Sequence, residues 1–381
     1  MTIAYNHVVT RIRPQIIAAN YNVMNERGGN CYAVVKADAY GHGLAEVAKV
    51  LAEAGARTMA VGTVGEALEL LGTGFGGRVV ALLGAQLPED FEAAAREGIV
   101  CFCARREQLA KLSEAGLRLG RRVPVALKFD TGMRRLGFVP EAVGEVLETV
   151  TALAGIEVVM VASHLAVADE PAEEAFVQEQ ATRFETVVSF LRAAGLRFEA
   201  TLANSAAVLA YPKLRLDGQR PGISLYGGNP FWGTDKEQLG CCLRQAMETE
   251  TRIYQVHPLK KGETISYGRT FTAERDMRVA VIGAGYADAW SRGLSGRGQV
   301  LVHGRRAPVV GRVCMQMTAV DVTLVPEAAA GDAVWLLGGP GQGHIRVEEL
   351  ASWWGTISYE VYCLLGLNRR EYVLDSPGEN A

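Results

Sequence analysis

The stretch LAEVAKVLAEAGARTMAVGTV (residues 44–64) contains the unit from which most of this chain is built. Its first part, LAEVAKVLAEAG (44–55), carries apolar side chains every three or four positions, which is typical of an amphipathic helix. Its end, TMAVGTV (58–64), is a nearly continuous apolar run of strand length. Such runs are typical of parallel strands that are covered on both faces. The stretch therefore predicts a helix followed by a buried parallel strand.

The same alternation continues up to about residue 230. Helix-like stretches such as PEDFEAAAREG (88–98) separate most of eight apolar runs. The runs are Cys31–Lys36, Thr58–Val64, Arg78–Leu83, Ile99–Ala104, Val123–Phe129, Ile156–His164, Phe198–Ala203 and Gly218–Tyr226. Eight such units favour a (β/α)8 barrel. An open doubly wound sheet is the alternative, but its usual six strands leave two runs over, and no G-x-G-x-x-G motif follows the first run.

The pattern changes after about residue 235. Short apolar runs that are broken by glycine, aspartate and proline predict strands at Val279–Ile282, Gln299–Val302, Pro308–Val310, Thr318–Leu324 and Ala333–Leu337. Several of them are joined by hairpin-like connections, which is typical of a separate, mostly β domain. We therefore expect a barrel domain over residues 8–235 and a mostly β domain over residues 236–381.

Composition excludes several classes of protein. The 381 residues are 49% hydrophobic with a net charge of −3, which excludes wholesale disorder and lacks the basic excess of a nucleic-acid-binding surface. No apolar run approaches the roughly 20 residues of a membrane span, and the N-terminal stretch MTIAYNHVVTRIRP lacks the apolar core of a signal peptide. The seven cysteines form no C-x-x-C pair, so we expect no zinc ribbon and no metal site. We expect reduced thiols in a cytoplasmic protein.

Polar side chains stand where several of the apolar runs end. These are Lys36, Lys128, Ser163 with His164, and Asn204 with Ser205, while Arg220 stands in the last run. Active sites of (β/α)8 barrels form at the C-terminal ends of the strands. We therefore expect these groups to converge on one mouth of the barrel, although the pattern alone names no reaction.

The block AVVKADAYGHG (33–43) closely resembles the pyridoxal-phosphate lysine motif of the alanine racemases. The resemblance continues in the family's order through KFDTGMRRLGF (128–138), SHLAVADE (163–170), ANSAA (203–207), RPGISLYG (220–227), ISYGRTF (265–271), GAGYADAW (283–290), GRVCM (311–315) and TISYE (356–360). It implies a (β/α)8 barrel that carries pyridoxal 5′-phosphate and a β domain that completes the partner's active site in a homodimer. It also assigns residues 1–7 to the β domain, where we expect the family's first strand to be truncated.

The resemblance implies an isomerase that interconverts L-alanine and D-alanine with two opposed bases and supplies D-alanine for peptidoglycan. The cofactor delocalises the charge left when the α-proton is removed. Lys36 matches the lysine that binds the cofactor and acts as one base. Tyr267 matches the tyrosine that the partner subunit supplies as the other. A phenol has an ordinary pKa near 10, so Tyr267 is expected to need cationic neighbours.

The resemblance also implies the cofactor's other contacts. Arg220 matches the residue that faces the pyridine nitrogen, and a guanidinium does not give up its proton to that nitrogen. His164 matches a histidine that links this arginine to the catalytic tyrosine. The expected phosphate ligands are the backbone N–H groups of Gly222 and Ile223 and the hydroxyls of Ser205, Tyr40 and Tyr359.

The substrate contacts implied by the resemblance are Arg135 and the backbone N–H of Met315. Lys128 matches a lysine that is often carbamylated by CO2, which would give Arg135 an anionic neighbour. One residue departs from the family: Gln316 stands where an acidic residue is common, which leaves the fine specificity open. Tyr286 and Tyr359 match bulky residues of the family's gate region and favour a small substrate.

Three other functions remain open at this point. The first is a racemase of broader specificity, acting on serine or basic amino acids. The second, from another class, is a protein that binds pyridoxal phosphate without turnover, although the single-domain barrels of that kind lack a β domain. The third is a related barrel decarboxylase, which the blocks around Tyr267 and Met315 disfavour.

Overall fold

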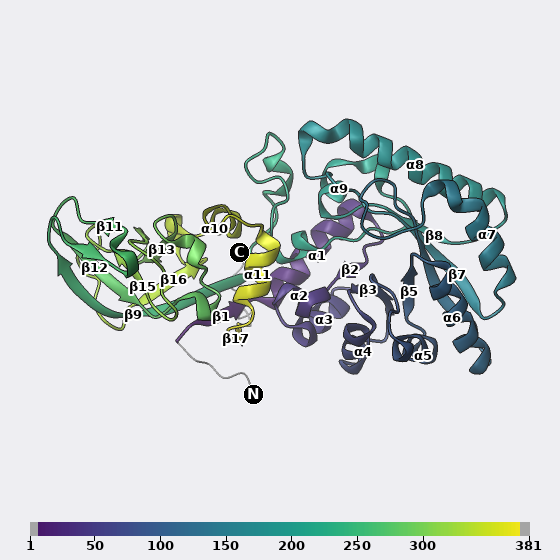
Figure 1. Cartoon of the computed structure of the whole chain (residues 1–381), viewed down its shortest axis with the longest axis horizontal. Helices are drawn as coiled ribbons and strands as arrows, with labels where there is room; N and C mark the ends of the chain where they lie inside the picture. The colour runs from purple at the N-terminus through teal and green to yellow at the C-terminus, as the bar shows by residue number, and fades with distance from the viewer. Residues whose placement is uncertain (1–6, 374–381) are drawn as a thin grey trace. The chain divides into compact units, whose positions relative to one another are not determined.

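The computed structural model describes residues 7–373, which fall into two compact units (Figure 1). The barrel unit comprises Ile17–Ala39 and Leu44–Leu243. The β unit comprises the chain up to Ile16, the short segment Tyr40–Gly43 and the chain from Arg244 onward. These limits differ from the predicted limits at residues 8 and 235. Of residues 1–7, which the sequence assigns to the β domain, 1–6 lie outside the described residues.

The barrel unit contains seven parallel strands that pair in sequence order. They are β2 (Ala33–Val34), β3 (Thr58–Val61), β4 (Arg78–Ala81), β5 (Val100–Cys103), β6 (Val123–Lys128), β7 (Ile156–Ala162) and β8 (Glu199–Thr201). The helices are α1 (Pro14–Gly28), α2 (Lys36–Tyr40), α3 (Leu44–Glu53), α4 (Val64–Gly72), α5 (Pro88–Glu97), α6 (Arg106–Arg118), α7 (Val143–Ala152), α8 (Glu174–Ala193) and α9 (Ser205–Ala210). Figure 1 shows α3 to α8 around the outside of the strands.

Two residues take the place of the eighth strand. Gln219 forms a parallel bridge with Cys31 before β2, and Arg220 forms one with Asn204 after β8. The backbone N–H of Arg220 donates to the carbonyl of Ala203 at 2.9 Å, so the two ends of the sheet are joined here. This confirms the predicted (β/α)8 class. The run predicted at Gly218–Tyr226 is shorter than expected, because Pro221 has no N–H for the ladder and Ile223–Tyr226 turns into a 3-10 helix.

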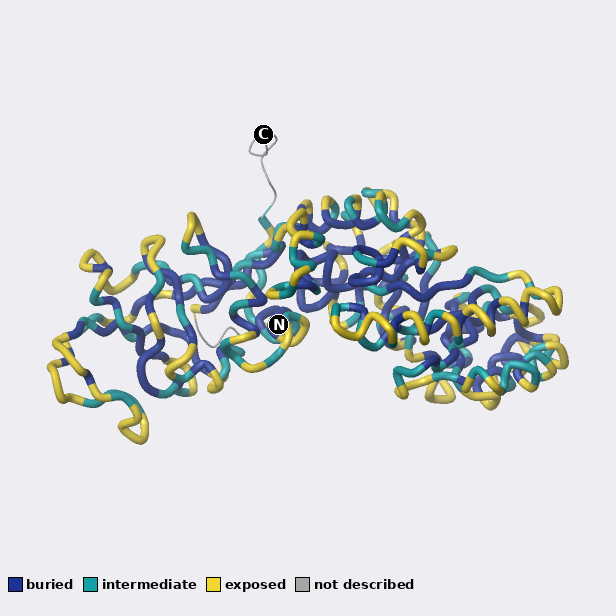
Figure 2. Tube along the Cα trace, turned by 90° about the horizontal axis from the view of Figure 1, so that it is seen from above, coloured by how far each residue is buried: buried dark blue, intermediate teal, exposed yellow. Residues whose placement is uncertain are grey.

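The strands of the barrel are buried and its helices are exposed on one side only. All residues of β3 and β5 are buried, and α3 buries Leu44, Val47, Ala48 and Leu51. Figure 2 shows buried strands inside a layer of helices whose outer turns are exposed. The apolar runs and the helical spacing seen in the sequence both follow from this arrangement, since each strand is covered on two faces.

The β unit is built on one long strand, β9 (Met247–Leu259). Its first half pairs with β1 (Val9–Ile12) and β16 (Ala333–Leu337), and its second half pairs with β12 (Met277–Ile282). The other strands are β10 (Thr264–Ile265), β11 (Phe271–Thr272), β13 (Gln299–Val302), β14 (Arg305–Pro308), β15 (Thr318–Asp321) and β17 (Arg369–Tyr372). Strand β1 also pairs in parallel with β17, so this sheet includes a strand that precedes α1 in the chain.

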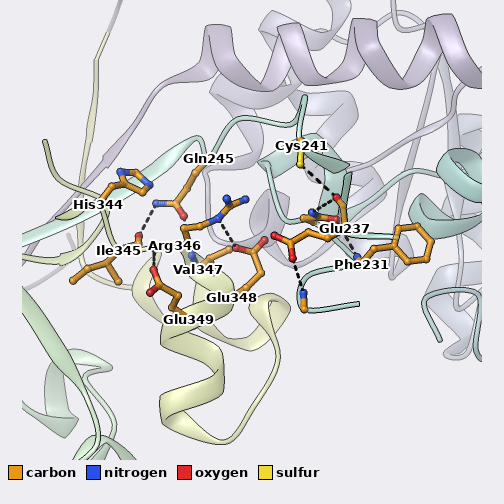
Figure 3. A network of polar contacts seen from close by, with 12 residues as sticks. Phe231, Glu237, Cys241, Gln245, His344, Ile345, Arg346, Val347, Glu348 and Glu349 are labelled. Atoms are coloured by element: carbon orange, nitrogen blue, oxygen red, sulfur yellow. Dashed lines mark hydrogen bonds and ion pairs between the residues drawn. The ribbon is translucent and has the colours of Figure 1, made fainter. Parts of the chain in front are cut away.

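Two helices complete the β unit, α10 (Val347–Trp354) and α11 (Ser358–Leu365). The start of α10 is fixed by polar contacts (Figure 3). The Gln245 side chain accepts from the N–H of Val347 at 2.9 Å, and the carboxylate of Glu349 accepts from the N–H of Arg346 at 3.0 Å. No helix within residues 7–373 is long and apolar enough to cross a membrane.

Candidate active site

Lys36 lies two residues after the end of β2, at the start of a turn with unusual backbone conformation. Ala37, Asp38 and Ala39 have φ values of 53° and ψ values between 48° and 54°, and Tyr40 has a φ of 54°. L-residues in this left-handed conformation cost about 1–2 kcal/mol each. Glu66 stabilises the turn by accepting a hydrogen bond from the N–H of Ala37 at 2.7 Å. A run of strained residues at the end of a barrel strand is typical of a functional site.

Lys128 is the last residue of β6 and lies among other cations. Its ammonium group donates to the carbonyl of Phe129 at 3.3 Å. Burial lowers the pKa of Lys128 well below its ordinary value, and the charges of Arg220 and Arg135 lower it further, while Asp130 opposes the shift. Lys128 therefore loses its proton more readily than an ordinary lysine. The neutral amine is the form that reacts with CO2.

Arg220 is buried at the mouth of the barrel, with only 6% of its surface exposed. Its guanidinium donates to the hydroxyl of Thr201 and to the carbonyls of Ser163 at 2.5 Å and Leu202 at 3.3 Å. Burial lowers the pKa of Arg220 to about 10, so the side chain stays charged near neutral pH. The hydrogen-bond acceptors around this buried cation are neutral, so they fix its position without neutralising its charge.

His164 follows β7 and is surrounded by the candidate cations. Burial is the largest cause that lowers its pKa well below the ordinary value, and the charges of Arg220, Lys128, Arg135 and Lys36 lower it further. His164 is therefore neutral near pH 7. These five side chains, which come from four of the apolar runs or follow one of them, share one electrostatic environment in the barrel unit.

The segment after the closing bridge forms a small cradle of polar groups. The hydroxyl of Ser205, at the start of α9, accepts hydrogen bonds from the N–H groups of Gly222 at 2.9 Å and Ser224 at 3.4 Å. Ile223 begins the 3-10 turn that follows Gly222. The buried hydroxyl of Ser224 has no hydrogen-bond partner within the described part of the chain. Backbone N–H groups and hydroxyls gathered in this way suit a phosphate group.

A pocket of about 380 Å³ in the barrel unit is lined in part by Lys128 and Arg135. Its polar lining includes Lys128, Arg135, Arg105, Gln86 and Gln108. The remaining lining residues are Leu82, Leu83, Phe102, Ala104, Leu136 and Gly137. Because three of its polar side chains are basic and none is acidic, the pocket suits an anionic group.

The β unit presents Tyr267 to solvent. Tyr267 lies in a 3-10 turn between Ser266, with φ of 69°, and Gly268, with φ of 72°. The Ser266 hydroxyl donates to the carbonyl of Arg312 at 2.6 Å, and a Cβ on Gly268 would lie only 2.9 Å from the Arg312 guanidinium. This turn holds the Tyr267 side chain outward, with 71% of its surface exposed.

Met315 is also exposed on the β unit, at 58% of its surface. It lies in a turn that the N–H of Cys314 closes by donating to the carbonyl of Met317 at 2.9 Å. The N–H of Ala287 donates to the carbonyl of Met315 at 2.9 Å, which ties this turn to the segment that carries Tyr286. Tyr286 is itself exposed.

Tyr40 and Tyr359 come together within the β unit. Their ring centroids are 5.9 Å apart with planes tilted by 43°. Burial raises the pKa of Tyr40 above its ordinary value, and Tyr359 and Cys363 add to the shift. The Tyr40 phenol is therefore held neutral, as a hydrogen-bond donor must be.

Two residues that support the site were missed in the sequence. Thr201 is the one hydroxyl residue in the apolar run Phe198–Ala203, and the structure shows that it is buried. Glu66 forms a capping box with Thr63 at the start of α4 and also holds the turn after Lys36. The spacing T-x-x-E predicts the first of these roles but not the second.

Comparison with known proteins assigns both parts of the chain. Residues 12–230 match the model of the N-terminal domain of alanine racemase, and residues 246–372 match that of its C-terminal domain. The alanine racemase of Nitratidesulfovibrio vulgaris (strain Miyazaki F) is 50% identical over 98% of this chain and 100% of its own length. The alanine racemase of Lawsonia intracellularis is 38% identical over 94% of this chain and 95% of its own length.

Solved structures are similar over nearly the full length. The crystal structure of alanine racemase from D-cycloserine-producing Streptomyces lavendulae has a TM-score of 0.90 and 32% identity, and covers 99% of each chain. That of alanine racemase from Bartonella henselae, with covalently bound pyridoxal phosphate, has a TM-score of 0.86 and 28% identity. It covers 96% of this chain and 99% of its own.

Proposed function

Because the chain belongs to the alanine racemase family, we infer that it is an isomerase that interconverts L-alanine and D-alanine with pyridoxal 5′-phosphate as cofactor. The single observation that best supports this function is the group of basic side chains around His164 at the barrel mouth. Arg220 is a buried cation with neutral acceptors, and His164 beside it is held neutral by burial and by surrounding positive charge.

The residues at the mouth fit this cofactor. Lys36 supplies a primary amine on the rim for covalent attachment. The cradle of Gly222, Ile223 and Ser205 would supply phosphate donors. The Ser224 hydroxyl next to it in the chain has no partner within residues 7–373, which supports a site with hydrogen-bonding capacity to spare. The positive charges around His164 match the negative charge of a phosphate and of an amino-acid carboxylate.

The chain's own residues would divide the work of moving one proton. When bound, the cofactor supplies the electron sink that makes the α-proton of the amino acid removable. Lys36 takes or returns the proton on one face of the α-carbon, and the Tyr267 oxygen does so on the other face. Arg220 would hold the ring nitrogen of the cofactor by a hydrogen bond and would keep its own proton, which would restrain side reactions. A neutral His164 has one donor and one acceptor nitrogen, so it could link Arg220 to Tyr267 by hydrogen bonds.

Substrate orientation falls to Arg135 and to the N–H of Met315, which would hold the carboxylate. The lowered pKa of Lys128 supports its carbamylation, because CO2 adds to the neutral amine and releases one proton. The resulting carbamate would be an anion beside Arg135 and would hold that guanidinium in place.

The active unit is proposed to be a homodimer in which each β unit completes the partner's site. The support is the exposure of Tyr267, Met315 and Tyr286, because large apolar and aromatic side chains that are exposed together mark interaction surfaces. In this arrangement Tyr267 acts on a substrate bound at the barrel site that contains Lys36 of the other subunit. D-alanine made in the cytoplasm would serve peptidoglycan synthesis.

The test of this function is circular dichroism of L-alanine solutions incubated with the purified chain. We expect the signal to decay to zero as the two enantiomers equilibrate. Borohydride reduction followed by peptide mapping should find the cofactor on the peptide that holds Lys36, and labelling of another lysine would contradict the assignment. Cofactor binding without decay of the signal would favour a protein without turnover.

A racemase of broader specificity is the second candidate, and Gln316 favours it, because an acidic residue is common at this position in the family. The same dichroism assay with L-serine and L-lysine separates the two candidates. Decay with alanine alone would assign the narrow specificity.

A further inference from the structure

The lysine block ends in Gly41-His42-Gly43, and the proposed chemistry uses none of these three residues. The structure nevertheless assigns Tyr40–Gly43 to the β unit, although the chain on both sides of this segment belongs to the barrel unit. The segment therefore packs more closely with distant residues than with its neighbours in sequence. The contacts of this segment within the β unit indicate the role of Gly41, His42 and Gly43.

One face of α11 lies along this segment. Tyr359 contacts the ring of Tyr40, Tyr362 and Cys363 approach Gly41, and Gly366 ends the helix against Gly41. Positions 359, 362, 363 and 366 have the spacing of residues that share one side of a helix. The contact is therefore continuous from the first turn of α11 to its C-terminal end.

Gly41 and Gly366 pack backbone against backbone. A Cβ on Gly366 would lie 2.5 Å from Cα and 2.6 Å from the carbonyl carbon of Gly41, and closer still to its oxygen. Gly366 has φ of −65°, so its own conformation suits any residue. Glycine is needed at position 366 only because Gly41 is so close.

His42 and Gly43 extend the same contact. The His42 ring is fully buried and meets the Tyr362 ring edge-on, with centroids 4.9 Å apart. Its Nδ1 lies 3.0 Å from the carbonyl oxygen of Tyr40, and because a carbonyl only accepts, Nδ1 must donate. A Cβ on Gly43 would overlap the hydroxyl of Tyr372. His42 thus fixes the backbone of Tyr40 itself.

We propose that Gly41, His42 and Gly366 are positioning residues for the cofactor phosphate. They lock Tyr40 onto the helix that carries Tyr359, so that the two phenols are presented together as one bidentate donor to one phosphate group. This inference rests on the proposed function and adds a role that the resemblance did not assign. Two pre-placed donors bind an anion more tightly than two mobile ones, because less side-chain freedom is lost on binding.

The experiment compares pyridoxal 5′-phosphate with pyridoxal, which has the same aldehyde and ring but no phosphate. Full-length protein freed of cofactor is titrated with each compound, and the visible absorption of the lysine-bound form gives two dissociation constants. Their ratio measures the phosphate contribution alone. A change that only weakens packing alters the two constants together and leaves the ratio unchanged.

Gly366→Ala is the main variant, because it introduces a methyl group where the two backbones meet without straining φ. We expect the preference for the phosphorylated compound to fall about 10–100-fold, as for the loss of one charge-assisted hydrogen bond. Gly144→Ala in α7 is the matched control, since its Cβ would meet no atom within 4 Å. The control should keep the wild-type ratio.

A second pair of variants applies if Gly366→Ala does not fold. His42→Asn keeps an N–H near the carbonyl of Tyr40, whereas His42→Leu removes it. We expect His42→Asn to retain most of the preference and His42→Leu to lose several-fold more of it.

The outcomes distinguish a failure of the proposed phosphate site from a failure of the positioning role. If the wild-type chain binds the two compounds equally well, the proposed phosphate site fails. If the wild-type chain prefers the phosphorylated compound and Gly366→Ala and His42→Leu keep that preference, only the positioning role is overturned. A loss of affinity for both compounds in equal measure would also overturn it, because the contact would then serve packing alone.

Discussion

In the barrel unit, Arg220 is 6% exposed and its hydrogen bonds all go to neighbouring strand ends, whereas in the β unit Tyr267 is 71% and Met315 58% exposed. The barrel thus surrounds its candidate groups with its own backbone and shifts their pKa values by burial. The β unit instead fixes the backbone of its candidate residues by tight turns and leaves their side chains in solvent. This difference supports the proposal that the β unit of one subunit completes the barrel site of another.

The largest expected effect comes from removing the oxygen that the β unit exposes. Tyr267→Phe keeps the ring and should slow racemisation about 10²–10⁴-fold in both directions, which is the usual contribution of a general base. Exchange of the α-proton of D-alanine with deuterated water should persist through Lys36, while exchange from L-alanine should collapse. Mass spectrometry of the recovered alanine measures both.

A control variant, Tyr286→Phe, removes the phenol oxygen of another exposed tyrosine. It should leave the α-proton exchange rates of L-alanine and D-alanine similar to each other. Equal loss of exchange from the two enantiomers in Tyr267→Phe would contradict the assignment of the two faces.

The next effect tests whether the two units act across subunits. Lys36→Ala and Tyr267→Phe are each expected to be nearly inactive. Mixed in equal amounts and allowed to exchange subunits, they should recover about one quarter of the wild-type rate, because half of the dimers are hybrids with one intact site of two. If verified hybrids stay inactive, the β unit must act within its own chain.

A smaller effect is expected inside the barrel, at the hydroxyl that accepts from Arg220. Thr201→Val keeps the shape of the side chain and leaves one N–H of a buried guanidinium without an acceptor. We expect the free energy of unfolding to fall by about 1–3 kcal/mol in urea titrations, and Thr201→Ser to restore most of it. Ser224→Ala is the contrasting control, because its hydroxyl has no partner in residues 7–373 and should cost little. Equal losses in Thr201→Val and Thr201→Ser would point to packing instead.

The smallest effect is the pH dependence that burial of His164 adds to the barrel. The unfolded histidine takes up a proton near its ordinary pKa of 6.5, whereas the folded one, with its lowered pKa, does not. The unfolded state therefore binds more protons, and stability from this residue rises with pH up to about 6.5 and then levels off. Below that pH the wild type should lose up to about 1.4 kcal/mol per pH unit.

His164→Gln should show a shallower loss of stability in urea titrations between about pH 5 and 7. Parallel profiles for the two proteins would show that His164 titrates normally in the folded chain.

The barrel was more predictable from the sequence than the β unit, for a physical reason. Its strands are covered on both faces, so they appear as apolar runs, and seven of the eight predicted runs contain the observed strands β2 to β8. The longest strand of the β unit, β9, was not predicted. It carries Glu250, which is buried but paired with Arg11 at 2.6 Å, and such charged residues interrupt the apolar pattern. Its residues make sense only beside the strands they pair with.

The order of polar residues at the ends of apolar runs was enough to place Lys36, Lys128, His164, Ser205 and Arg220 on one barrel, and the lysine block was enough to suggest the cofactor. These features are local in sequence, because strand burial and motif spacing repeat along the chain. The tertiary structure alone decided that Thr201 holds Arg220, that Glu66 holds the turn after Lys36, and that Gly41 packs against Gly366. Each of these contacts depends on the close approach of segments that are separated in the chain. Packing of the whole fold sets that approach, and the local sequence around each residue does not.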